Sequence, residues 1–114
     1  MEEMIAKLKT FLHMETELPI EEFSAYYKDL VGYLNTEFEN LDQDALLQAR
    51  YICSIVQANA GDRAKQSKAS AKVFKKMSSK CSFWSDAISF RLQKNFGLTQ
   101  ADMDSAMERI NERM

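Results

Sequence analysis

Apolar residues recur every three or four positions through most of the chain, a pattern that predicts α-helices. We expect a first amphipathic helix over residues 2–15 and a second from about 19 to 39. Pro19 suits the first turn of the second helix, whose core stripe includes Phe23 and Leu30. The N-terminal third of the chain is therefore predicted to be helical.

The third predicted helix is apolar on nearly every side between residues 45 and 60. Asp42 precedes it as a predicted N-cap, because a short acidic side chain accepts hydrogen bonds from the free N–H groups of a first turn. A helix that is apolar all round is normally buried by its neighbours. We therefore expect the segment 45–60 to lie at the centre of the fold.

The sequence offers two positions for the end of this helix. Gly61 followed by Asp62 supplies a glycine C-cap and then an N-cap residue. A polar cluster at 66–70 is the alternative, and a turn there gives arms of similar length over 42–66 and 68–95. The matched arms slightly favour the later turn, and the choice stays open.

The fourth predicted helix ends near Gly97 and carries two apolar stripes. The longer stripe alternates spacings of three and four residues and consists of Phe74, Met77, Cys81, Trp84, Ile88 and Leu92. A second stripe of Phe83, Ala87 and Phe90 lies about 140° away by helical geometry. We therefore expect the half of the helix over 81–92 to be covered on two sides.

A last helix follows Thr99, which together with Asp102 has the spacing of a capping box. One side of this helix is rich in methionine, a flexible residue that fills cores and also forms adaptable contact surfaces. Core filling is one interpretation of this side. The other is a docking or dimer surface formed by Met103, Met107, Ile110 and Met114.

Composition supports one helical domain over residues 1–114. The chain is 46% hydrophobic and 28% charged, with one proline and three glycines, which is too few for the many turns of a sheet protein. The predicted fold class is all-α: a four- to five-helix antiparallel bundle with a short C-terminal helix.

The net charge of −2 hides a segregated distribution. Residues 1–62 carry twelve acidic and four basic side chains, whereas residues 63–94 carry nine basic side chains and one acid, Asp86. Six lysines fall within roughly 140° of one another on a helical projection and would form one cationic face about 20 Å long. This lysine face, the candidate site for an anionic partner, consists of Lys65, Lys68, Lys72, Lys75, Lys76 and Lys80.

Several roles for the lysine face stay open. Lysines on the outside of a helix are ordinarily solvated or paired loosely with acids of the same bundle. Such a face also attracts an acidic protein, a nucleic-acid backbone or an anionic membrane surface. Nucleic acid is disfavoured by the sequence pI of about 5.4, by the scarcity of arginine and by the lack of exposed aromatic residues among these lysines.

No catalytic or metal-binding set emerges from the sequence. His13 is the only histidine, and Thr10 occupies the position where bundle metal sites commonly have glutamate. Cys53 and Cys81 both fall on apolar sides of helices, which predicts buried structural thiols. A turn near residue 67 would put both thiols at the same height, and whether they are close in space stays open. We expect no enzymatic activity, no metal and no cofactor.

No stretch approaches about 18 consecutive apolar residues, and no secretory signal is recognisable, so we expect a cytoplasmic protein that does not span a membrane. The leading functional hypothesis is a non-enzymatic helical module that binds another protein or self-associates as a homo-oligomer. The alternative is a nucleic-acid-associated accessory protein that uses the lysine face.

Overall fold

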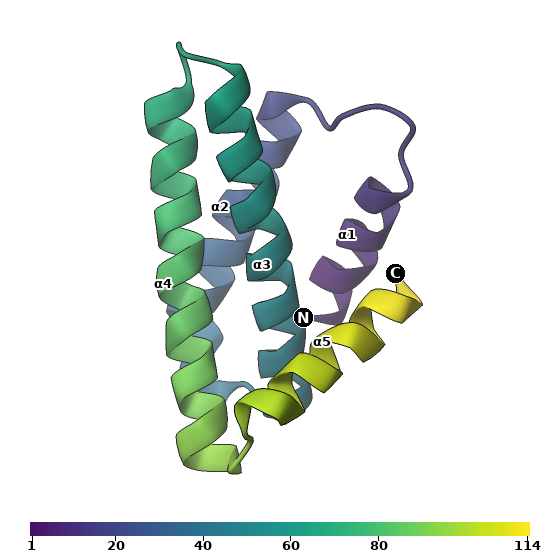
Figure 1. The fold of residues 1–114 in the computed structure, drawn as a ribbon, viewed down its shortest axis with the longest axis vertical. Helices are drawn as coiled ribbons and strands as arrows, with labels where there is room; N and C mark the ends of the chain where they lie inside the picture. The colour runs from purple at the N-terminus through teal and green to yellow at the C-terminus, as the bar shows by residue number, and fades with distance from the viewer.

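A computed structural model of the protein describes residues 1–114 and confirms the predicted all-α bundle (Figure 1). None of its helices is both long enough and apolar enough to cross a membrane. The elements are α1 (Glu2–Leu12), α2 (Ile20–Glu37), the 3-10 helix η1 (Phe38–Asn40), α3 (Gln43–Gln66), α4 (Ala71–Phe96) and α5 (Gln100–Arg113).

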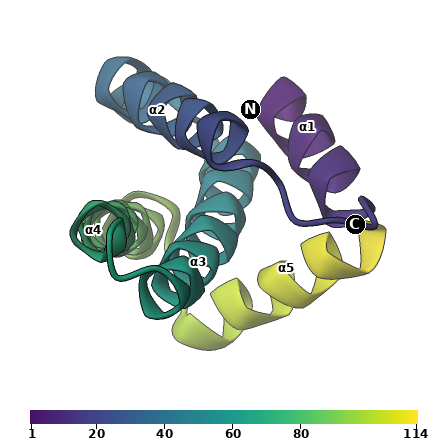
Figure 2. The ribbon, with the colours of Figure 1, turned by 90° about the horizontal axis from the view of Figure 1, so that it is seen from above.

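Helix α3 lies at the centre of the fold, with the other four α-helices around it (Figure 2). Its buried side chains are Leu46, Leu47, Ala49, Tyr51, Ile52, Cys53, Val56, Ala60 and Arg63. The apolar ones belong to one core of 22 buried residues, to which all five helices contribute. The predicted central position of the segment 45–60 is confirmed.

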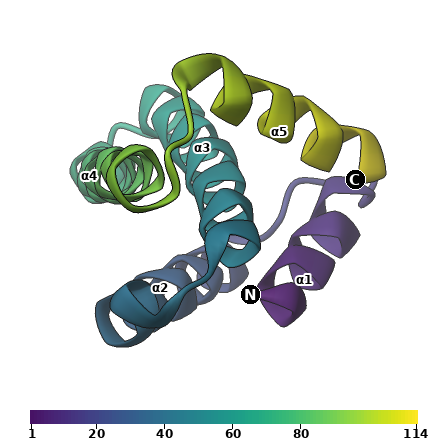
Figure 3. The ribbon, with the colours of Figure 1, turned by 90° about the horizontal axis from the view of Figure 1, so that it is seen from below.

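The helices around α3 are distributed unevenly. Helix α4 runs antiparallel to α3, whereas α5 turns obliquely away from the end of α4 and reaches the C-terminal end of α1 (Figure 1, Figure 3). The Tyr51 hydroxyl donates to Asn111 Oδ1 at 2.7 Å and ties α5 to α3. Helices α1 and α5 thus cover the side of α3 away from α4, and α4 forms an edge of the bundle.

Three helix ends lie at the positions that the sequence predicts, two of them capped by polar side chains and one formed by a glycine. The Asp42 side chain accepts a hydrogen bond from the backbone N–H of Ala45 at 2.8 Å. Thr99 and Asp102 form a reciprocal capping box at the start of α5. Gly97 ends α4 with a φ of +68°, a left-handed conformation that glycine adopts without steric cost.

The later of the two predicted breaks is the one that the structure contains. Helix α3 continues through Gly61 and ends at Gln66, where Ser67 takes an extended conformation. Gly61 therefore needs none of the left-handed freedom that a C-cap requires. A Cβ atom at Gly61 would meet nothing within 4 Å.

We predict opposite effects of alanine at the two glycines. Gly61→Ala should raise the free energy of unfolding by about 0.5–1 kcal/mol, because alanine loses less entropy in a helix. Gly97→Ala should lower it by about 1–2 kcal/mol, because a Cβ clashes in the left-handed region. Urea denaturation followed by circular dichroism measures both, and a destabilising Gly61→Ala would contradict the continuous α3.

Candidate functional site

The lysine face is divided between two helices and their connection. Lys65 lies in the last turn of α3, Lys68 lies in the turn that follows, and the other four lysines lie on α4. The prediction of one continuous helical face is therefore wrong for Lys65 and Lys68, because the chain reverses direction after Gln66 and α4 begins only at Ala71.

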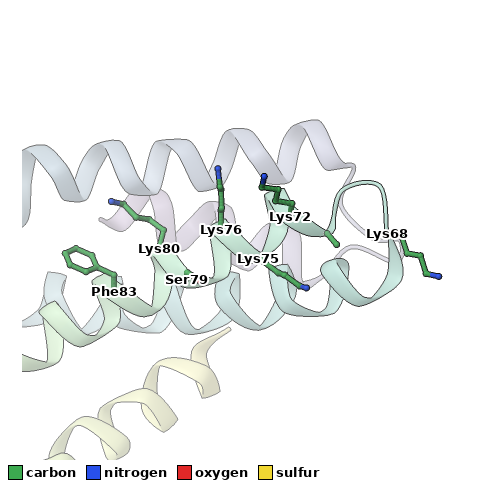
Figure 4. Close-up of a pocket in the computed structure, with 8 residues that line it drawn as sticks. Lys68, Lys72, Lys75, Lys76, Ser79, Lys80 and Phe83 are labelled. Atoms are coloured by element: carbon green, nitrogen blue, oxygen red, sulfur yellow. The ribbon is translucent and has the colours of Figure 1, made fainter.

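Five of the six lysines gather around one open hollow of about 780 Å³ along α4 (Figure 4). The lining residues are Lys68, Ala71, Lys72, Lys75, Lys76, Ser79, Lys80 and Phe83. Lys72 and Lys76 point to one side of α4 and Lys75 points to the other, so ammonium groups flank the hollow on both sides. The hollow is shallow and open to solvent along the length of its lining residues.

None of these lysines takes part in an ion pair within the protein. The single ion pair of the chain joins Arg63 Nε to Glu17 Oε1 at 3.7 Å. Pairing with the acidic helices of the same bundle was one interpretation of the lysine face, and the structure excludes it at contact distance. The positive charge of the lysine face therefore acts on the solvent and on any anion that approaches.

Two aromatic side chains extend the lysine face along α4. Phe83 is 58% exposed and Phe90 is 61% exposed. Lys80 Nζ lies 5.3 Å from the centre of the Phe83 ring, and Lys94 Nζ lies 5.9 Å from that of Phe90. The prediction that this stripe is covered is wrong for Phe83 and Phe90, because α4 is an edge helix and α5 packs on the far side of α3, whereas Ala87 is partly buried.

The arginines of the basic stretch are both occupied by internal contacts. Arg91 donates from Nη1 to the carbonyl oxygen of Phe38 and from Nη2 to that of Glu39 at 2.8 Å, which fixes η1 against α4. Arg63 is buried, which the sequence analysis did not predict. It donates to the Leu18 carbonyl oxygen at 2.6 Å and holds the α1–α2 connection over α3. The free cations of the surface along α4 are therefore lysines.

Arg63 also borders a cleft of about 200 Å³ between α1, α2 and α3. Its guanidinium lies 4.4 Å from the centre of the Phe23 ring and donates to Asn59 Oδ1 at 2.7 Å. These contacts, together with those to Glu17 and Leu18, engage the cation in holding the fold together. We therefore assign Arg63 a structural role.

The methionine side of α5 faces the protein interior. Met103 is fully buried, and Met107, Ile110 and Met114 are partly buried against the core. Core filling is therefore the interpretation that the structure supports for Met103, whereas a docking or dimer surface that includes the partly exposed Met107, Ile110 and Met114 stays a prediction. The physical reason for the burial of Met103 is that a helix as short as α5 is stable only when its apolar stripe is buried, and α3 and α1 supply the cover.

Cys53 on α3 and Cys81 on α4 are both buried in the core, and both are free thiols. Burial raises the pKa of Cys81 to about 11, and it raises the pKa of Cys53 as well, with a further Coulombic contribution from Cys81. The protonated state of the two thiols makes them poor nucleophiles at neutral pH.

The structure contains no cluster of titratable side chains that could form a metal site. His13 Nε2 contacts the carbonyl oxygen of Met114, where the end of α1 meets the end of α5. No three side chains of histidine, cysteine, aspartate or glutamate lie close enough together to hold a metal ion. The chain matches no known protein family, no curated protein and no solved structure. The candidate functional site is therefore the lysine face together with the exposed rings of Phe83 and Phe90 on α4.

We predict that the protein loses stability as the pH rises from about 9 to 11. The folded protein keeps the Cys81 proton in this range, whereas the unfolded chain, with an ordinary thiol pKa of 9.0, releases it. Deprotonation therefore favours the unfolded state, by up to about 1.4 kcal/mol per pH unit for each such group. Below pH 9 this contribution is complete and constant.

Urea denaturation at intervals of pH measures the effect. Cys81→Ala is the control, since it removes one of the protons that the folded state retains. Its stability should fall less steeply with pH than that of the original protein. Equal slopes in the two proteins would contradict a raised Cys81 pKa.

Proposed function

We propose that this protein is a non-enzymatic interaction module that binds an acidic segment of another protein along the outer side of α4. The observation that supports the proposal is a row of lysines without a single internal carboxylate partner, on a helix that the rest of the fold leaves exposed. Charges left unpaired on a rigid helix attract and orient an anionic partner over a long range.

The distribution of charge over the rest of the molecule favours a localised protein partner. Residues 1–62 and 95–114 are both net acidic, so an extended polyanion that spreads beyond α4 is repelled. A short acidic protein segment can stay within the hollow along α4. The same acidic surroundings penalise wrapping by a long nucleic-acid chain.

Nucleic acid is the second candidate partner. The structure contains one feature in its favour that was not expected from the sequence, an exposed aromatic ring beside a lysine. Phe83 lies exposed beside Lys80, and an aromatic ring next to a cation is a common platform for an unpaired base. Arginine, the usual base-reading residue, is not free on this face, because Arg91 is bound to carbonyl oxygens. We therefore place the acidic protein segment first.

Charge reversal on α4 tests the proposal. Fluorescein-labelled polyglutamate should bind the original protein in low salt and dissociate as salt is raised. The triple variant Lys72→Glu, Lys76→Glu, Lys80→Glu should bind at least about tenfold more weakly, because repulsion replaces attraction. Fluorescence anisotropy measures both, and circular dichroism checks that the exposed substitutions leave the fold intact.

The matched control reverses three exposed lysines on other helices, Lys7→Glu, Lys9→Glu and Lys28→Glu, and so gives the same net charge. It should bind polyglutamate as the original protein does. Equal losses in the two triple variants would mean that net charge alone governs binding, against the proposal. Tighter binding of labelled single-stranded DNA than of polyglutamate at the same ionic strength would favour the nucleic-acid alternative.

A further inference from the structure

The outer side of α4 carries a second regular repeat beside the buried one. Positions spaced alternately three and four residues apart form a line, here called the outer seam: Val73, Lys76, Lys80, Phe83, Ala87, Phe90 and Lys94. This alternation is the spacing with which one helix packs along another. The outer seam extends about 32 Å along α4, and its seven positions lie on average about 120° around the helix from the buried stripe.

The outer seam holds the most exposed apolar side chains of the protein. Phe90 at 61%, Phe83 at 58% and Val73 at 53% exceed every other large apolar residue in exposure. Single exposed apolar residues are ordinary, but these three align on one side of the helix and form an apolar line parallel to its axis. A side of a helix with this pattern normally packs against a second helix, and this chain supplies none.

On the basis of the proposed function, we infer that the outer seam binds an acidic amphipathic α-helix of another protein. The apolar stripe of that helix packs on Phe83 and Phe90, and its carboxylates lie beside Lys76, Lys80 and Lys94. A helical partner fits because its own side chains recur at the same average interval along its axis as the positions of the outer seam. An extended segment, with a period of two residues, does not keep this register.

Charge argues against a second copy of this chain as the occupant. If two copies paired in parallel, each lysine of the outer seam would lie beside the same lysine of the other copy. If they paired antiparallel with Phe83 opposite Phe90, Lys80 of one copy would lie near Lys94 of the other. Like charges that face each other across an interface disfavour it, whereas the carboxylates of an acidic helix are complementary.

Two synthetic peptides of identical composition separate the inference from the proposed function. The first peptide places leucines on one helical stripe with glutamates on both sides, and the second has the same residues in an order that removes the stripe. Neither contains tryptophan, so Trp84, the only tryptophan of the protein, reports binding. Its ring lies 5.4 Å from the Phe83 ring, at the middle of the outer seam.

We expect the striped peptide to bind at least about tenfold more tightly than the reordered one, with a change in Trp84 fluorescence and a gain of helical circular dichroism. The double variant Phe83→Ala, Phe90→Ala should bring the affinity for the striped peptide down to that of the reordered one. Leu12→Ala, at an exposed apolar residue of α1, is the control and should change neither affinity. Since Phe83 and Phe90 are exposed, their replacement leaves the core intact.

Each other outcome has a defined meaning. Equal affinities for the two peptides, with no effect of the double variant, would overturn the inference. The proposed function would still stand in that case if the protein binds polyglutamate. Absence of binding by both peptides and by polyglutamate would overturn both. Dimerisation in analytical ultracentrifugation that disappears in the double variant would make a second copy the occupant and would also overturn the inference.

Discussion

The burial of α3 is the constraint on which the rest of the structure depends. A helix that is apolar on nearly all sides has to be enclosed, and in a chain of 114 residues each neighbouring helix must contribute its apolar stripe to that enclosure. Helix α5 turns back across α3 and gives its methionines to the core, and α1 meets it on the same side. Helix α4 covers α3 with its buried stripe and is left at the edge of the bundle.

This arrangement of the helices explains why the unpaired lysines and the exposed phenylalanines lie together on α4. Most acidic residues lie outside α4, whereas most basic residues between 63 and 94 lie on this one long edge helix. Both arginines of that stretch hold neighbouring segments in place through carbonyl oxygens. The lysines of the lysine face and the exposed Phe83 and Phe90 hold no neighbouring segment in this way, which is consistent with the binding role proposed for them.

The sequence predicts the helices, their caps and the central position of α3, because these follow from local periodicity and from short polar side chains at helix ends. It does not predict what lies over Phe83 and Phe90, since an apolar stripe indicates a preference for burial but not which molecule provides it. The same limit applies to Met103, whose stripe suits a core and a docking surface equally well. The burial of Arg63 is not predicted from the sequence, because it depends on α3 continuing through Gly61 to meet the connection after α1.

Solvent paramagnetic relaxation enhancement by NMR measures whether α3 is enclosed and the outer side of α4 is open, because a soluble relaxation agent reports the exposure of every side chain in one experiment. We expect strong enhancement at the rings of Phe83 and Phe90 and almost none at Phe74, Ile52 and Val56, which are buried. Protected rings at Phe83 and Phe90, or strong enhancement along the middle of α3, would contradict this arrangement.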